Sequence, residues 1–183
     1  MTEAEPRWLS DEDQWVWRQI IAVINMLPPR LERELQRAHG LSLHDYQILV
    51  RLSEHPDREV RLSDLAEATQ QSKSRLSHQM TRMENAGLVA RRNCPTDRRG
   101  AFAVLTEEGW RVLEAAAPTH VEGVREHLMD VMTPAQKQVV GEAFGAVAEN
   151  LRPPTRPTSC PKPSPAPGAA PSPDRHQTSS SGV

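Results

Sequence analysis

The sequence predicts a mainly α-helical fold with one small β-hairpin, and three observations support this prediction. Apolar residues recur at helical spacing over 16–38, 110–128 and 139–147. Ser and Thr residues, which favour the position before the first turn of a helix, stand shortly before each of these runs. Two short apolar segments flank the turn PTDRRG (95–100), a pattern that is typical of a hairpin.

Composition argues against several classes of protein. The 183 residues have room for one ordinary domain and a further segment. No run of about eighteen apolar residues occurs and the start is acidic, so we expect a cytoplasmic protein without a membrane span. Cys94 and Cys160 lack disulfide or zinc spacing, and His120 with His127 supplies too few ligands, so no metal or cofactor is expected. We expect no enzyme, because phosphate-binding glycine loops and hydrolase motifs are absent from the sequence.

Charge and proline are distributed unevenly along the chain. Nine of the sixteen prolines fall within 152–183, which we predict to be a disordered tail. Residues 1–151 hold 18 basic and 23 acidic residues, yet 72–100 hold seven basic residues against two acidic ones. The near-neutral total therefore conceals one strongly basic segment on an acidic body, which points to a polyanionic partner.

The first helix is expected from Ser10, which caps three acidic residues, to Gly40. Pro28 and Pro29 interrupt its pattern, so we predict either a kink or two consecutive helices near Leu27.

Next, Ser42 opens a second helix with Asp45 as its reciprocal capping residue, and His55 with Pro56 ends it. A short strand is expected at 60–62.

The segment 63–105 predicts a helix-turn-helix followed by a hairpin. Ser63 caps a short helix, the turn TQQS follows, and Ser72 caps a second helix that ends at the left-handed Gly87. The second helix is polar and basic on its exposed side, which is typical of a DNA-reading helix. The extended segments 88–94 and 101–105 then form the hairpin with a doubly basic tip.

Two further helices close the ordered part of the chain. Thr106 opens one that is bent at Pro118, and Thr133 caps the last, with Pro134 at its first position and Gln136 as the reciprocal capping residue. Four side chains of the last helix are expected to point inward: Val139, Val140, Phe144 and Val147.

Residues 62–109, LSDLAEATQQSKSRLSHQMTRMENAGLVARRNCPTDRRGAFAVLTEEG, resemble the winged helix-turn-helix core of the MarR (multiple antibiotic resistance regulator) family. The ordered set of MEN-x-GLV, DRRG and LT-x-x-G is its most specific part. The resemblance implies a homodimeric, ligand-responsive transcription regulator, most often a repressor, on a pseudo-palindromic operator in double-stranded DNA. It covers roughly residues 10–151 and implies an N-terminal dimerisation helix region (10–40), the winged helix-turn-helix (41–105) and C-terminal dimerisation helices (106–151). Outside it we expect a flexible N-terminus (1–9) and the tail (152–183).

The resemblance also suggests DNA contacts. Side chains near the start of a groove-bound helix reach phosphates and base edges, and the alternative for Ser72 is a purely structural cap. In the hairpin tip, Arg99 is expected in the minor groove, Arg98 on a phosphate, and Asp97 as a brace for Arg82 or Arg75. The predicted DNA-binding residues are Ser72, Lys73, Ser74, Arg75, Ser77, His78, Arg82, Asp97, Arg98 and Arg99.

A small-molecule effector is implied as well, in a site between the dimerisation helices and the DNA-binding lobe. Flat rings and one fixed cation suit an aromatic or phenolic anion; the candidates are Trp15, Trp17, Arg18, His44 and Tyr46. The alternative is that the tryptophans belong to a dimer core. Two other functions stay open: a winged-helix module that binds protein without DNA, and a thiol-based regulator that acts through Cys94.

Overall fold

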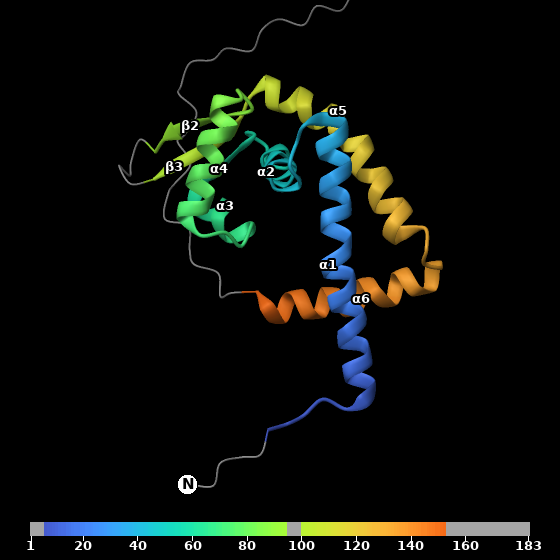
Figure 1. The fold of residues 1–183 in the computed structure, drawn as a ribbon. Coiled ribbons are helices and arrows are strands. Elements are labelled where there is room, and N and C mark those ends of the chain that lie inside the picture. Colours follow the sequence, from blue (N-terminus) through green and yellow to red (C-terminus); the bar gives the residue numbers. More distant parts are fainter. Residues whose placement is uncertain (1–5, 95–99, 153–183) are drawn as a thin grey trace, which may run out of the picture.

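The computed structural model describes residues 6–94 and 100–152, and it has the expected mainly helical architecture. The element order is α1 (Asp11–His39), α2 (Leu43–Ser53), β1 (Glu59–Arg61), α3 (Leu62–Ala68), α4 (Lys73–Asn85), β2 (Val89–Asn93), β3 (Ala101–Leu105), α5 (Glu107–Val124), the π-helical turn η1 (Arg125–Met129) and α6 (Pro134–Leu151). Helices α2 to α4 and the strands form a lobe at one end of α1, while α6 lies apart from it (Figure 1). No helix within these described residues is long and apolar enough to cross a membrane.

The strands form one antiparallel sheet in the order β1-β3-β2. Ala103 in the central strand faces Val60 on one side and Arg91 on the other. The sheet confirms the predicted hairpin, which we call the wing (residues 88–105). The short strand expected at 60–62 is observed as β1, one residue earlier, at the edge of the sheet.

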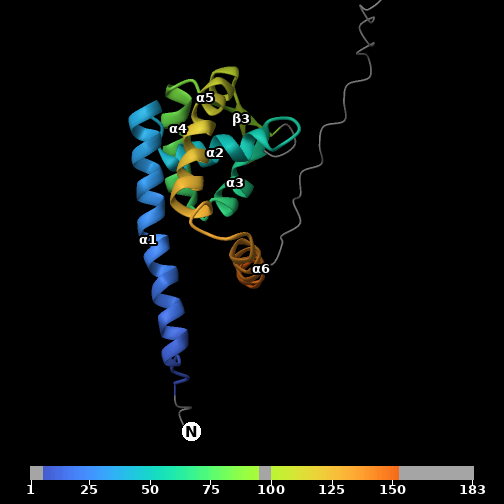
Figure 2. The ribbon, with the colours of Figure 1, turned by 90° about the vertical axis from the view of Figure 1, so that its right-hand side faces the viewer.

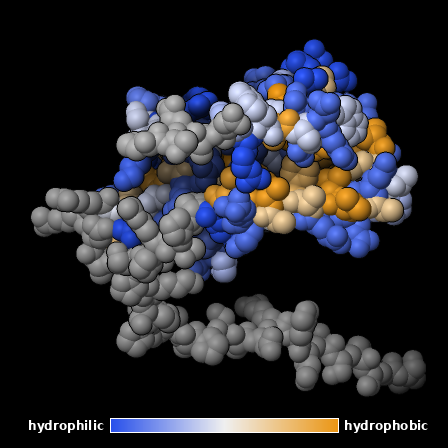
Figure 3. All heavy atoms as spheres, turned by 90° about the horizontal axis from the view of Figure 1, so that it is seen from below, coloured by the Kyte–Doolittle hydropathy of each residue, from blue (hydrophilic) through white to orange (hydrophobic). Residues whose placement is uncertain are grey.

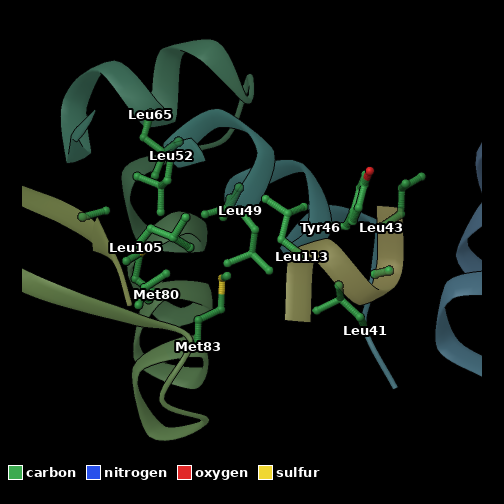
Figure 4. Close-up of a cluster of buried hydrophobic side chains, with 14 of the residues drawn as sticks. Leu41, Leu43, Tyr46, Leu49, Leu52, Leu65, Met80, Met83, Leu105 and Leu113 are labelled. Atoms are coloured by element: carbon green, nitrogen blue, oxygen red, sulfur yellow. The ribbon is translucent and has the colours of Figure 1, made fainter. Parts of the chain in front are cut away.

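The core of the lobe is a continuous cluster of buried aliphatic side chains (Figure 4). Leu49 and Leu52 of α2 meet Leu65 of α3 and the thioethers of Met80 and Met83 of α4, and all five are almost completely inaccessible to solvent. Because apolar burial is the main favourable term in folding, this cluster fixes α4 against the rest of the lobe.

Helix α1 is a single unbroken helix, so the alternative of two consecutive helices near Leu27 is wrong. Pro28 and Pro29 each remove one backbone donor, which leaves the carbonyls of Ile24 and Asn25 without an intrahelical partner. All four residues are exposed, so water can satisfy those carbonyls, and the packing of α1 against α5 holds the helix together.

Most predicted helix starts are confirmed, and two need correction. The hydroxyls of Ser10, Ser72, Thr106 and Thr133 accept hydrogen bonds from amides of the first turns of their helices. Ser42 does the same for the Asp45 amide, but the Asp45 carboxylate does not return to it and points to α4 instead. Ser63 is not a cap, because β1 continues directly into α3 and Arg61 occupies the capping position.

The prediction that Val139, Val140, Phe144 and Val147 point inward is wrong for the isolated chain. All four side chains of α6 are exposed, with Val139 at 64%. Figure 2 shows α6 end-on, beside the lobe rather than packed into it. Helix α5 runs unbroken through Pro118 and passes into η1.

Candidate nucleic-acid interface

Helices α3 and α4 form the helix-turn-helix, and α4 has one buried and one polar face. Leu76, Met80 and Met83 point into the core, as the apolar spacing predicts. The predicted contact residues that lie in the described part of α4 and at its cap are all exposed: Ser72, Lys73, Ser74, Arg75, Ser77, His78 and Arg82. Ser72 does act as the cap, since its Oγ accepts the amide hydrogen of Arg75 at 3.2 Å.

A buried polar network sets the orientation of α4 relative to α2. Asp45 and Gln79 are only 8% and 7% exposed. Gln79 Nε2 donates to Asp45 Oδ1 at 2.8 Å, and Arg82 Nη2 donates to Asp45 Oδ1 and Oδ2 at 2.8 and 3.0 Å. The sequence analysis missed this role of Asp45, because the pairing joins residues more than thirty positions apart and leaves no local signal.

The arginines of β2 are engaged on opposite sides of the strand. Arg91 donates to the Ser77 carbonyl at 2.8 Å and pairs with Glu84 at 3.1 Å, so it ties the wing to α4.

Arg92 lies over the Phe102 ring at 4.9 Å and pairs with Glu59 of β1 at 2.6 Å. This hydrogen bond to Glu59 raises the pKa of the Arg92 guanidinium. Both arginines therefore stabilise the base of the wing.

The wing tip lies outside the described residues, and with it Asp97, Arg98 and Arg99 and the expected brace to Arg82 or Arg75. At the edge of this gap, the Cys94 amide donates to the Gly100 carbonyl at 2.8 Å, which closes the base of the hairpin. Cys94 itself is 5% exposed.

Two hollows flank the start of α4. One, of about 250 Å³, lies between α3, α4 and β3. The other, of about 380 Å³, we call the α2–α4 hollow; it is lined by Ser42, His44, Arg75, His78, Gln79 and Arg82. His44, predicted as an effector contact, thus lies beside the exposed face of α4.

The five residues predicted to bind an effector do not form a single site within one chain. Trp15, Trp17 and Arg18 are exposed on the half of α1 that extends away from the lobe (Figure 1). His44 is exposed on α2, whereas Tyr46 is 6% exposed.

Tyr46 packs on His120 with ring centroids 4.5 Å apart. Burial raises the pKa of the Tyr46 hydroxyl and lowers that of the His120 imidazole. Within the described residues, no group of three His, Cys, Asp or Glu side chains is arranged to hold a metal ion.

The geometry defines a winged helix-turn-helix protein with a polar, basic second helix and a wing that belongs to a three-stranded sheet. A MarR family model matches residues 39–100. AbsC, a MarR family transcriptional regulator from Streptomyces coelicolor, is 51% identical over 80% of this chain and 99% of its own, with a TM-score of 0.75. This chain belongs to the MarR family, whose members are transcriptional regulators, and the expectation that it is not an enzyme is thereby confirmed.

Two further relatives have informative descriptions. Sco3205 of Streptomyces coelicolor, a MarR family transcriptional regulator solved in complex with DNA, is 45% identical over 82% of this chain and 94% of its own, with a TM-score of 0.77. The transcriptional regulator HosA of Escherichia coli O111:H- is 46% identical over 54 residues, and this match spans only 40% of HosA.

Proposed function

We propose that this protein is a homodimeric, sequence-specific DNA-binding regulator in which α4 enters the major groove. The exposed face of α4 is the observation that supports this most directly, because every predicted contact residue on it is solvent-exposed and an α-helix fits the groove. The similar regulator Sco3205 was solved in complex with DNA, which supports DNA as the partner. The wing would follow the adjacent backbone and minor groove, with Arg99 as the proposed minor-groove contact and Arg98 on a phosphate.

Dimerisation is proposed from the uncovered apolar side chains of α1 and α6. In the described part of the chain, Trp15, Ile24, Met26, Phe144 and Leu151 are between 49% and 73% exposed. Figure 3, which views the molecule from below, shows apolar surface as an orange band. A second copy of the chain would bury this apolar surface. The two α4 helices of such a dimer would then bind an inverted repeat whose half-site centres lie about 10 base pairs apart.

Regulation is proposed to be repression that a small aromatic or phenolic ligand relieves, in a cytoplasmic protein that associates with the nucleoid when bound to DNA. Trp15, Trp17 and Arg18 lie on the uncovered part of α1, so a ligand site that joins them to His44 or Tyr46 would need the second subunit.

The test is fluorescence anisotropy with DNA from the region upstream of the protein's own gene. We expect binding that resists competitor DNA and weakens steeply with salt, because phosphate contacts release counterions. Arg99→Ala should weaken it by about 1–3 kcal/mol if this arginine enters the minor groove. Absence of salt-dependent, competitor-resistant binding by the wild type would favour the protein-interaction module instead.

A further inference from the structure

The α2–α4 hollow gathers arginine and histidine side chains from two helices. Arg75, His78 and Arg82 come from α4, and His44 comes from the first turn of α2. We propose that this hollow binds one phosphate of the DNA backbone, that His44 is a DNA contact, and that proton uptake by its imidazole accompanies binding. The inference rests on the proposed function and adds to it a contact from α2, which lies outside the helix-turn-helix and the wing.

The two carboxylates near the hollow, those of Asp45 and Glu32, already accept hydrogen bonds from other groups of the protein. The Asp45 carboxylate is 8% exposed and accepts hydrogen bonds from Gln79 and Arg82. Glu32 of α1 accepts the amide hydrogen of Leu43. Arg82 keeps 64% of its side chain exposed despite its pairing with Asp45, so its remaining N–H groups are open to an additional acceptor.

Side chains, rather than the helix start, make this site. The Leu43 amide donates to Glu32 and the Asp45 amide donates to the Ser42 hydroxyl, so these two amides of α2 are already used. The exposed imidazole of His44 and the exposed guanidinium groups of Arg75 and Arg82 can donate to a phosphate, because guanidinium and imidazolium groups both bind phosphate oxygens.

The position of the hollow favours a nucleic-acid phosphate. Arg75 and His78 line the hollow and also belong to the exposed face of α4. A helix about 10–12 Å wide nearly fills the major groove, which brings the phosphates at the groove edge against the flanks of the helix. The hollow lies on such a flank, so a strand passing α4 would pass His44 as well.

Binding of a phosphate beside the His44 imidazole would make this contact depend on pH. Imidazole is the side chain whose ordinary titration falls between about pH 5 and pH 8, and a bound phosphate favours the protonated form. The facing charged groups are Arg75 and Arg82 on α4, Asp45 on α2 and Glu32 on α1. Since the complex holds more protons than the free protein, affinity should rise as pH falls from about 8 to about 6.

The experiment compares full-length variants by fluorescence anisotropy on a labelled duplex of arbitrary sequence about three helical turns long. Such a duplex suffices because a phosphate contact does not depend on sequence. At about pH 6, His44→Gln should weaken binding by roughly three- to tenfold and lower the slope of log K against log salt by about 0.9 for each site lost. At about pH 8 the two proteins should differ less.

Two further variants separate this contact from a structural effect. His44→Lys keeps a cation at every pH tested, so it should retain the affinity of the wild type at low pH and flatten the pH profile. His55→Gln changes an exposed histidine beyond the opposite end of α2 and should behave as the wild type does.

If the wild type binds DNA with the expected salt dependence but His44→Gln matches it in affinity, salt slope and pH profile, the phosphate site is wrong and the proposed function stands. A loss of affinity without any change in salt slope or pH profile likewise overturns it. If the wild type binds no duplex at any salt concentration, the proposed function itself fails.

Discussion

Asp45 illustrates, at the scale of a single residue, what the sequence can and cannot predict. Its spacing from Ser42 fits a reciprocal cap, and the serine half of that prediction is confirmed. The carboxylate instead contacts Gln79 and Arg82, because a buried charge is stabilised more by a guanidinium than by one exposed amide. Pairings between distant residues depend on the fold, so neither this network nor the position of His44 beside α4 could be derived from local patterns.

Asp45→Asn should lower the free energy of unfolding by about 1–2 kcal/mol. The variant leaves Arg82 without its charged partner, and the loss is limited because the arginine is largely exposed. Urea denaturation measures the change, and Glu114→Gln, at an exposed position of α5, is the matched control. Equal stability of Asp45→Asn and the wild type would mean that the network does not hold α4 in place.

The sequence predicts elements best where a helix start has its own cap. The starts of four helices were predicted correctly for that reason, at Ser10, Ser72, Thr106 and Thr133. The start of α3 was missed because the chain passes into it from β1 without a side-chain cap. For α1 the sequence left open a kink or two consecutive helices near Leu27, and the structure has one uninterrupted helix, because packing against α5 overrides the local propensity at the two prolines.

The LT-x-x-G motif acquires a structural explanation at the start of α5. The Thr106 hydroxyl lies 2.7 Å from the Gly87 carbonyl and 2.9 Å from that of Leu88, and it accepts the Gly109 amide hydrogen at 2.9 Å. A side chain at position 109 would collide with the Leu88 carbonyl and the Leu105 side chain. The motif therefore joins the end of α4, the wing and α5 at one point.

Gly109→Ala should destabilise the protein by about 1–3 kcal/mol, since backbone at Leu88 must move to admit the methyl group. Thermal or urea unfolding gives the measurement. Glu114→Ala, an exposed change in the same helix, should be close to neutral. A stabilised Gly109→Ala variant would contradict the close approach, because alanine otherwise favours a helix.

At the scale of the whole molecule, the apolar residues of α6 were recognised from the sequence but assigned to the wrong environment. Helical periodicity of apolar residues indicates that one face of a helix is buried. It does not indicate whether that face packs against the same chain or against another chain. The exposed apolar side chains of α6 are the reason that we propose a second copy of the chain as their cover.

Phe144→Glu should convert the proposed dimer to monomers, because a carboxylate buried at the interface would lack a partner. Sedimentation or light scattering should report a mass near 20.5 kDa rather than twice that value. The lobe should stay folded, as judged by circular dichroism, because Phe144 is 49% exposed and α6 lies apart from the lobe. Gln138→Lys, also exposed on α6, is the control; an unchanged dimer of Phe144→Glu would exclude this face from the interface.

The junction at Thr106 also has a mechanical consequence. It pins the first turn of α5 to the backbone that follows α4, and the eighteen residues of α5 extend about 27 Å from that point. Around such a pivot, a tilt of about 5° displaces Val124 by roughly 2 Å while Gly87 hardly moves. A rigid tilt of α5 about this junction would therefore reach the end of α4 as a rotation rather than as a translation.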